Sequence, residues 1–186
     1  MEAAAKDTEG EMLFYQSKVC EGVFHRISSG TTRDGLEVFG KMEKGYLLSV
    51  DSNWDMYGDG YLSGHYFSEG ALREQLEKAY PGLVFTEEPV ENQINMYKRD
   101  KVGHILFLTV GNKTISGEEF RQLLELPSSN FTMQAADGKI RFLCKGQGHG
   151  LGLSQYGGNV LAKEGKSYKE ILRYYFPECG VQKKDS

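Results

Sequence analysis

The segment Lys145-Gly146-Gln147-Gly148-His149-Gly150-Leu151-Gly152-Leu153-Ser154-Gln155-Tyr156-Gly157-Gly158 places six glycines within fourteen residues. Because glycine has no Cβ, this backbone can take φ > 0 and approach another backbone or a ligand closely. The residues that follow, 159–165, are typical of a helix, so the segment predicts a strand-to-helix turn. The unpaired N–H groups of a helix N-terminus suit a polar or anionic ligand. We therefore expect a ligand site at this turn; the alternative is an ordinary glycine-rich turn.

The length and the charge of the chain restrict its function classes. At 186 residues it suits one domain, or one domain with a small lobe around 60–100. It has 22 Lys+Arg against 26 Asp+Glu, a formal net charge of -4, without a long basic run. Nucleic acid is therefore not an expected partner, whereas a neutral or weakly polar polymer such as a glycan is compatible. The 11 Tyr, 10 Phe and 1 Trp either line a sugar site or fill the core and sheets.

Local signals predict an α+β fold with mostly antiparallel strands, hairpins and about four short helices. Helices are indicated by Ser68 with an apolar face up to Pro81, by capping boxes at Ser116 and Ser167, and after Ser154. Strand-like runs occupy residues 11–16, 19–25, 36–39, 46–50, 83–86, 90–98, 102–110, 131–134 and 140–144. Between the last two runs, Asp137-Gly138 indicates a type I′ hairpin.

The chain ends and the cysteines show no chemistry of their own. Residues 1–7 indicate a helical tail or a non-native start, and residues 182–186 a polar tail, around a domain of residues 8–181. No apolar run has the length of a membrane span, and no signal peptide opens the sequence. Cys20, Cys144 and Cys179 lack the close spacing of a zinc motif. One disulfide is compatible with them, but its partners cannot be read from the sequence.

A second polar cluster begins at His25. This histidine ends a strand-like run and is followed by Ser28, Ser29 and Thr32. Together these side chains offer several hydrogen-bond donors and acceptors, which suits a sugar; the alternative is a turn with a capping hydroxyl. Further along, the segment Asp51-Ser52-Asn53-Trp54-Asp55 has two carboxylates, but it lacks the residue order of a calcium loop.

Four ordered blocks of the sequence match one protein family. They are residues 23–32, residues 116–131, the glycine-rich run and residues 165–177. The run follows a signature of about Gly-x-Gly-x-Gly-His-Gly-Val-Gly-Met-Ser-Gln-Tyr-Gly-Ala, with Leu151, Leu153 and Gly158 at the Val, Met and Ala positions. With these blocks the chain resembles the stage II sporulation protein D family over about residues 8–181.

The resemblance implies a cell-wall activity. Members of that family cleave peptidoglycan glycan strands as lytic transglycosylases, which requires a carboxylic acid of raised pKa to protonate the glycosidic oxygen. The C6 hydroxyl of the sugar captures the intermediate, so no second carboxylate is required. The family's acid lies in a helix resembling Glu-Ala-Leu-Lys-Ala-Gln-Ala-Val-Ala-Ala-Arg-Thr-Tyr, which nothing in this sequence matches, Glu2 included. The chain alone is therefore expected to bind glycan but to be nearly inactive.

The resemblance also implies where substrate binds and where the protein acts. Sugar hydroxyl and N-acetyl groups are expected to contact His149, Ser154, Gln155, Tyr156, Gly148 and Gly150, with His25, Ser28, Ser29 and Thr32. No metal or cofactor is expected. The expected partners are peptidoglycan glycan strands and other cell-wall hydrolases that act in engulfment during sporulation. The expected location is the cell envelope outside the cytoplasm, with a membrane anchor in an N-terminal segment absent from this chain.

Three other functions remain open. A module that only binds the cell wall or enhances an amidase is the main alternative. A zinc site would use His25, His65 and His149 with a cysteine, although neither His-Glu-x-x-His nor Cys-x-x-Cys occurs. A hydrolase would use Ser154 or Cys144 as nucleophile with His149 as base, although Ser154 lacks the Gly-x-Ser-x-Gly elbow.

Overall fold

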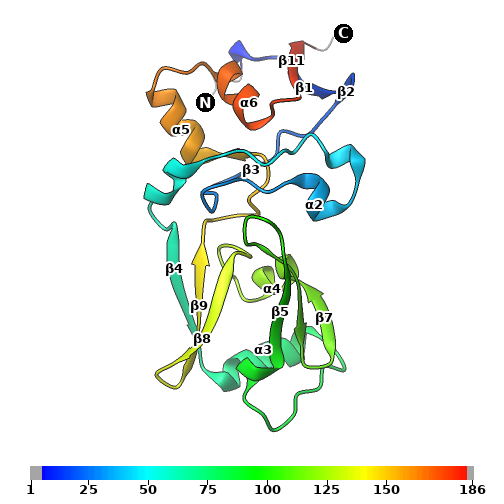
Figure 1. Ribbon diagram of the computed structural model, residues 1–186, viewed down its shortest axis with the longest axis vertical. Coiled ribbons are helices and arrows are strands. Elements are labelled where there is room, and N and C mark those ends of the chain that lie inside the picture. Colours follow the sequence, from blue (N-terminus) through cyan, green and yellow to red (C-terminus); the bar gives the residue numbers. More distant parts are fainter. Residues whose placement is uncertain (1–5, 184–186) are drawn as a thin grey trace.

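The computed structural model describes residues 6–183 and has two halves stacked along its long axis (Figure 1). The helices are α2 (Gly35–Phe39), α3 (Glu69–Ala79), α4 (Gly117–Leu123), α5 (Gln155–Lys163), α6 (Tyr168–Tyr175) and the 3₁₀ helices η1 (Met42–Lys44), η2 (Asn53–Tyr57) and η3 (Val90–Gln93). The strands are β1 (Glu11–Tyr15), β2 (Lys18–Val19), β3 (Phe24–His25), β4 (Leu62–Phe67), β5 (Ile94–Arg99), β6 (Ile105–Val110), β7 (Lys113–Ser116), β8 (Phe131–Ala136), β9 (Lys139–Lys145), β10 (Leu153–Ser154) and β11 (Gly180–Lys183). None of these helices is long and apolar enough to cross a membrane.

Antiparallel pairing dominates the sheets, which confirms the α+β class. In the upper half of Figure 1, β1 pairs with β11 on one side and β2 on the other, and the short β3 and β10 pair in parallel. The lower half contains the sheets β4-β9-β8 and β5-β6-β7, both antiparallel throughout.

The predicted helix starts are confirmed by their caps. The side chains of Ser68, Ser116 and Ser167 each accept a hydrogen bond from a backbone N–H three residues on. At Ser116 and Ser167 the side chain of the glutamate three residues on accepts a hydrogen bond from the serine backbone N–H, which completes the capping box. The Asp137-Gly138 turn has φ values of 52° and 71°, as a type I′ hairpin requires.

Three of the predicted strands are wrong. Residues 36–39 belong to α2, because the Asp34 side chain caps this helix and Gly40, with a φ of 64°, ends it. Residues 46–50 are irregular, since the N–H and C=O of Val50 pair with Thr32. Residues 83–86 are also irregular, and Val84 N donates to the Asn112 side chain at 2.9 Å. In each case a helix cap, a loop residue or a side chain takes backbone hydrogen bonds that a neighbouring strand would otherwise make.

The two predicted tails lie mostly outside the described residues, which exclude 1–5 and 184–186. Residues 182 and 183 are described, and they end β11 rather than form part of a tail. They pair with Met12 and Glu11 of β1. Backbone hydrogen bonds in a sheet do not depend on side-chain polarity, so the polar composition misled the prediction here.

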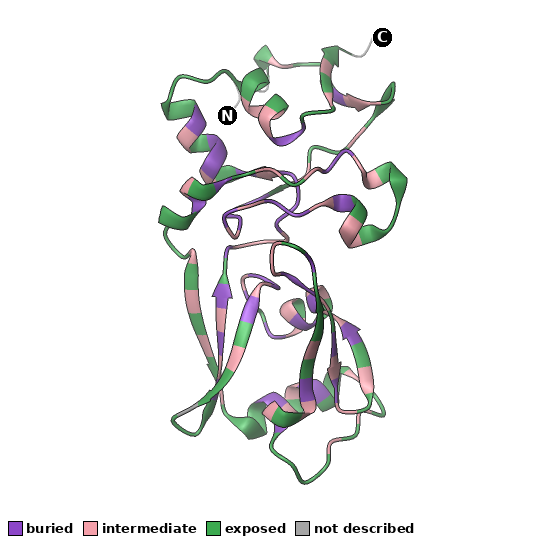
Figure 2. Cartoon of the chain, in the orientation of Figure 1, coloured by how far each residue is buried: buried purple, intermediate pink, exposed green. Residues whose placement is uncertain are grey.

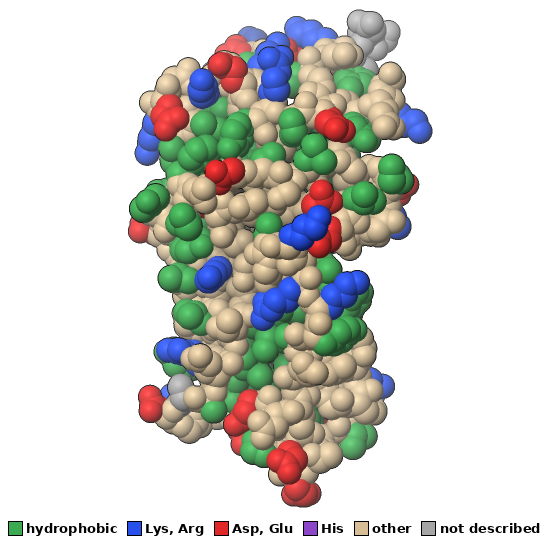
Figure 3. Space-filling view, in the orientation of Figure 1, with side chains coloured by type: hydrophobic (Ala, Val, Ile, Leu, Met, Phe, Trp, Pro, Cys, Tyr) green, Lys and Arg blue, Asp and Glu red, His purple; other side chains and the backbone are tan. Residues whose placement is uncertain are grey.

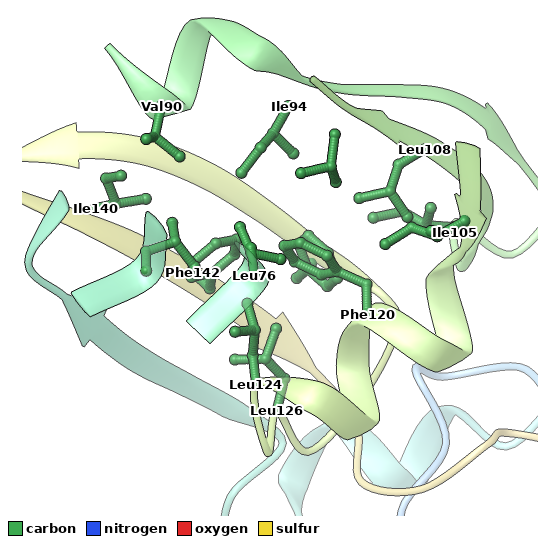
Figure 4. Packing of buried hydrophobic residues seen from close by; sticks show 14 of the residues in the cluster. Leu76, Val90, Ile94, Ile105, Leu108, Phe120, Leu124, Leu126, Ile140 and Phe142 are labelled. Atoms are coloured by element: carbon green, nitrogen blue, oxygen red, sulfur yellow. The ribbon is translucent and has the colours of Figure 1, made fainter. Parts of the chain in front are cut away.

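The lower half packs around an apolar cluster between α3, α4 and the two sheets (Figure 4). The rings of Phe120, Phe131 and Phe142 have centroids 5.4 to 5.8 Å apart. Leu72 and Leu76 of α3 are fully buried in the same cluster. Its members extend along the sequence from residue 72 to residue 144, well beyond the lobe expected around 60–100.

The upper half has its own apolar cluster. It takes Leu161 from α5, Tyr175 and Phe176 from the end of α6, and Tyr46 and Leu47 from the irregular segment. Figure 2 shows buried residues in both halves and along the segments between them. Each half therefore has a separate core, and the surface between the two cores is available for a site.

Two chain crossings and a buried ion pair join the halves. The chain enters the lower half after Tyr61 and returns at Gly146, whose N–H donates to Tyr61 O at 2.8 Å. Arg33 of the upper half donates through Nε to Asp100 of the lower half at 2.6 Å, and the two side chains are 4% and 1% exposed. Because separating them would leave a buried charge without a partner, this pair fixes how the halves meet.

We expect Phe142→Ala to lower the free energy of unfolding by about 3–5 kcal/mol, because it leaves a cavity between two buried rings. The matched control is Tyr66→Ala on the adjacent strand β4, whose side chain is exposed. Urea unfolding followed by circular dichroism measures both variants, and the control should lose less than about 1 kcal/mol. Equal losses would mean that the lower core is not packed around Phe142.

Candidate functional site

Four glycines of the run pack against the segment that begins at Val23, without room for side chains. All have positive φ, namely Gly146 76°, Gly148 107°, Gly150 76° and Gly152 68°. A Cβ on Gly146 would lie 2.9 Å from Ile27 O, and one on Gly148 would lie 2.8 Å from His25 Cβ. A side chain at either position would both collide and strain the backbone, so glycine is required there.

Backbone hydrogen bonds join the run to residues 25–33. Gln147 O accepts from Arg26 N and Ile27 N, both at 3.1 Å, and Gln147 N donates to Ile27 O at 2.7 Å. Further along, Arg33 N donates to Gly150 O at 2.8 Å. The structure thus brings together the two segments that the sequence analysis assigned to one site.

Asp55 of η2 lies beneath this junction and is fully buried. Its carboxylate accepts hydrogen bonds from Ser28 N at 2.7 Å and from Ser154 Oγ at 2.9 Å. Ser154 Oγ in turn caps α5 by accepting from Gly157 N at 3.2 Å. Ser154, predicted to contact substrate, is therefore buried and fully used in connecting α5 to Asp55. In the sequence, Asp55 is a candidate only for a calcium loop, because nothing local indicates these distant partners.

The hydroxyls after His25 also have partners within the protein. Ser28 Oγ accepts from Gly30 N at 3.1 Å. Thr32 Oγ1 donates to Leu48 O at 3.3 Å and accepts from Val50 N at 2.9 Å. Ser28 and Thr32 are buried, whereas Ser29 is half-buried. The Ser28 and Thr32 hydroxyls hold turns of the upper half together, whereas Ser29 Oγ lies 3.5 Å from His104 Nε2 of the lower half.

The N-terminus of α5 is not the open anion site that the sequence analysis expected. Tyr156 N donates to Arg26 O at 3.1 Å, and Gly157 N donates to Ser154 Oγ. Because these N–H groups already have acceptors in the protein, they do not face a ligand. The expectation was wrong because Ser154 Oγ and the distant Arg26 O act as acceptors, and the sequence of the turn does not reveal Arg26 O.

Three histidines gather around Arg33. His25 is 3% exposed; its Nδ1 donates to Leu151 O at 3.0 Å, its Nε2 has no partner among the described residues, and burial lowers its pKa to about 4. His104 is also buried, with Nδ1 3.0 Å from Ser129 Oγ, and burial holds its pKa well below 6.5. Both rings are therefore neutral at physiological pH.

His149 is the histidine that reaches an open surface. It is half-buried, and its ring lies edge-on to that of His25 at 5.9 Å between centroids. Its Nδ1 accepts from Leu151 N at 3.1 Å, and its backbone O accepts from Arg33 at 3.1 Å. Burial lowers its pKa, so its ring is also neutral near pH 7 and is positioned as a hydrogen-bonding group.

His149 lines a cleft of about 400 Å³ between the two halves. One wall comes from the upper half, including α2, and the other from β6 and the start of α4, which Figure 1 shows below α2. Figure 3 shows basic side chains gathered across the middle of the molecule, where the halves meet. The apolar residues that line the cleft are Val23, Val38, Phe39, Leu47, Ile105, Leu106, Phe107 and Leu151. The charged residues that line it are Glu21, Arg33, Glu37, Lys44, Lys98 and Glu118.

Glu118 is the acidic group of the lower wall that sequence reasoning did not single out. Its Oε1 accepts from Arg121 at 2.6 Å and from Gln122 at 3.1 Å, while Oε2 has no partner among the described residues. Burial would raise the pKa of this carboxyl, but the hydrogen bonds and the charge of Arg121 outweigh it and lower the pKa. Glu118 is thus ionised at neutral pH and does not serve as a proton donor.

Gln155 and Tyr156 do not line this cleft. They border a separate hollow of about 410 Å³, together with Arg26, Ile27, Asp59 and Asn159. The predicted site residues therefore lie in three places: His149 in the cleft, Gln155 and Tyr156 in the hollow, and the others, buried except for Ser29 and Gly148, at the junction.

The geometry gives little support to the two hydrolytic alternatives. Among residues 6–183, no three His, Cys, Asp or Glu side chains are grouped so that they can hold a metal ion. His65 lies apart on β4, with Nε2 3.2 Å from Ser63 Oγ. Cys144 is buried in the lower core, which raises its pKa to about 11, and the hydroxyl of Ser154 donates to Asp55 rather than to a histidine. Neither is an activated nucleophile.

Comparison with known proteins agrees with the motifs. The chain is 31% identical to stage II sporulation protein D of Bacillus amyloliquefaciens over 183 residues and 28% identical to that of Bacillus subtilis over 184 residues, 98% of the chain in each case. The matches cover 51% of each relative, so the chain spans about half their length. It is also 32% identical to an amidase enhancer of Bacillus subtilis over 88 residues, 47% of the chain and 12% of that protein. No family model matches the chain. The resemblance to stage II sporulation protein D is thereby confirmed.

We expect Asp55→Asn to lower the free energy of unfolding by about 2–4 kcal/mol, because the amide replaces a buried acceptor oxygen with a donor. Ser28 N and Ser154 Oγ would then compete for one remaining acceptor. Asp59→Asn, at an exposed position four residues on, is the control and should be close to wild type. Urea denaturation measures both, and a neutral Asp55→Asn would show that Asp55 does not hold the junction.

We expect the protein to lose stability as the pH falls from about 7 to about 5. Unfolded His25 takes up a proton near its ordinary pKa of 6.5, whereas folded His25 resists protonation down to about pH 4. The unfolded state then binds more protons, and His25 alone removes about 2 kcal/mol at pH 5. Burial also lowers the pKa of His104, so this residue likewise reduces stability as the pH falls.

Urea midpoints at the two pH values, for wild type, His25→Gln and the control His65→Gln, measure this effect. His25→Gln should show the smaller pH dependence, and His65→Gln should follow wild type. An unchanged pH dependence in His25→Gln would contradict the assignment of a buried, neutral His25.

Proposed function

We propose that this chain binds the glycan strands of peptidoglycan in the cleft and holds them for a lytic transglycosylase resembling stage II sporulation protein D. The observation that carries the proposal is the position of His149. It belongs to the signature that the chain shares with that family, and it lies half-buried in the wall of a 400 Å³ cleft. Ligand sites of proteins are commonly clefts of this size with a few polar groups on mostly apolar walls.

The groups around His149 match the chemistry of an N-acetylated sugar chain. Phe39 and Phe107 line the cleft and are 45% and 41% exposed, so they offer apolar faces to sugar rings. Lys44 and Lys98 line it as well and suit the lactyl carboxylate carried by one of the two sugars. The half-buried ring of neutral His149, whose Nδ1 accepts from Leu151 N, offers the sugar a contact surface on the cleft wall.

Glycosidic cleavage requires an acid of raised pKa, and Glu118 of the lower wall does not supply it. The proton donor must remain protonated near neutral pH, and the pKa of Glu118 is lowered instead. We infer that the acid belongs to a part of the complete protein outside this sequence, and that the chain alone binds but hardly cleaves. Absence of a general acid typically costs about 10²–10⁴-fold in rate.

The setting that we propose is the cell envelope during sporulation, with a membrane anchor N-terminal to this chain and other cell-wall hydrolases as partners. Two of the relatives carry a sporulation name, which supports this setting. A non-catalytic wall-binding or amidase-enhancing role is the second candidate. It is favoured by the amidase enhancer match and by the missing proton donor.

We expect the chain to be retained on denuded glycan strands, and His149→Ala and Phe107→Ala each to weaken the binding by about tenfold, since each removes one central contact. His65→Ala on β4, outside the cleft, is the control and should bind as wild type does. Tyr156→Ala tests the separate hollow, and we expect a smaller loss from it. Co-sedimentation at several protein concentrations measures the affinities.

The same samples also test catalysis. Release of anhydro-sugar should stay near background for wild type and variants. Equal retention of wild type, His149→Ala and Phe107→Ala would contradict binding in the cleft. Ready release of anhydro-sugar by the chain alone would contradict the inference that its acid lies elsewhere.

A further inference from the structure

Two cysteines that are far apart in the sequence meet in the upper half. Cys20 Sγ lies 3.6 Å from Cys179 Sγ, although 159 positions separate the two residues. Both are free thiols and both are half-buried. The third cysteine, Cys144, is fully buried in the lower core and belongs to the other half of the molecule.

The register of the sheet β11-β1-β2 explains the meeting. Phe14 of β1 pairs with Val19 on one side and with Gly180 on the other. Cys20, one residue after Val19, is next to Leu13, and its N–H donates to Leu13 O at 2.9 Å. Cys179, one residue before Gly180, is next to Tyr15 in the same register. Leu13 and Tyr15 are two residues apart along β1 and share a face, so the two cysteines lie on the same face of the sheet. Both thiols therefore point into the upper core, over the central strand.

The surroundings of the pair favour a covalent bond over the other uses of paired thiols. Both side chains pack against the upper apolar cluster. In the part of the chain that the structure describes, no third His, Cys, Asp or Glu joins them to form a metal site. Burial raises the pKa of Cys20 and brings that of Cys179 to about 12, so neither thiol is an activated nucleophile for catalysis.

We propose that Cys20 and Cys179 form a reversible disulfide that covalently closes the sheet β11-β1-β2 across its central strand. The oxidant is a low-molecular-weight disulfide such as oxidised glutathione. The thiolate of one cysteine attacks the oxidant, releases one glutathione thiol and leaves a mixed disulfide; the second thiolate attacks the protein sulfur of that bond and releases the second thiol. Two cysteine thiols and one glutathione disulfide thus give one protein disulfide and two glutathione thiols.

The disulfide would connect the two ends of the fold. β1 and β2 open the described chain and β11 closes it, so the cross-link encloses nearly the whole sequence. A link between such distant residues restricts the unfolded chain strongly and raises stability when the folded geometry accommodates it. The two sulfurs lie 3.6 Å apart, and bond formation brings them to about 2.05 Å.

The test oxidises the full chain in glutathione buffers of increasing oxidised fraction at about pH 8.5, where more of each thiol is ionised. Free thiols are then blocked with an alkylating reagent, and digestion followed by mass spectrometry locates any cross-linked peptide. Urea midpoints are measured before and after oxidation, and again after reduction. Cys144→Ser is the matched control, and Cys20→Ser and Cys179→Ser each remove one partner.

We expect a peptide joining Cys20 to Cys179 in wild type and in Cys144→Ser, and none in Cys20→Ser or Cys179→Ser. The urea midpoint of wild type should rise on oxidation and return on reduction, while those of the two single variants should not move. If Cys20 and Cys179 stay alkylatable in excess oxidised glutathione, carry only separate glutathione adducts, or pair with Cys144, the proposal is overturned. Circular dichroism of each variant confirms that it is folded before it is scored.

Discussion

The contact of the glycine-rich run with the segment that begins at Val23 is the constraint on which the rest of the structure depends. Gly146 and Gly148 leave no space for a Cβ, so the two backbones meet directly and exchange hydrogen bonds. Arg33 adds the lower half to this junction. It donates to His149 O through its guanidinium and to Gly150 O through its backbone, and it forms the buried ion pair with Asp100. One contact thereby fixes both the position of His149 and the meeting of the halves.

This arrangement separates two roles that are mixed in the sequence motif. Ser154 donates its hydroxyl and Ser28 its backbone N–H to Asp55, so Asp55 connects the two segments that contain these serines. The Ser28 hydroxyl accepts from Gly30 N. These residues maintain the junction rather than contact a ligand. Of the motif's side chains, half-buried His149 and apolar Leu151 reach the cleft, and the charged groups there come from other elements. Much of the motif thus encodes the architecture that presents one histidine.

Features of short range were predictable from the sequence, and features of long range were not. The serine caps and the Asp137-Gly138 turn depend on residues at most three positions apart, and the structure has them as predicted. The bonds of Asp55 reach 27 and 99 positions along the chain, and no local pattern indicates them. Likewise, His149 and Tyr156 are seven residues apart yet border different hollows, because α5 begins between them and turns away.

Titration of isotopically labelled protein with a denuded glycan oligomer, followed by NMR, shows whether the junction presents His149 to glycan in the cleft between the halves. We expect the largest shifts at the His149 ring and at Phe107 and Phe39, with the amides of Gln147 and Ile27 unchanged because the junction stays closed. Shifts centred on Tyr156 and Asp59, with the cleft unaffected, would contradict this expectation.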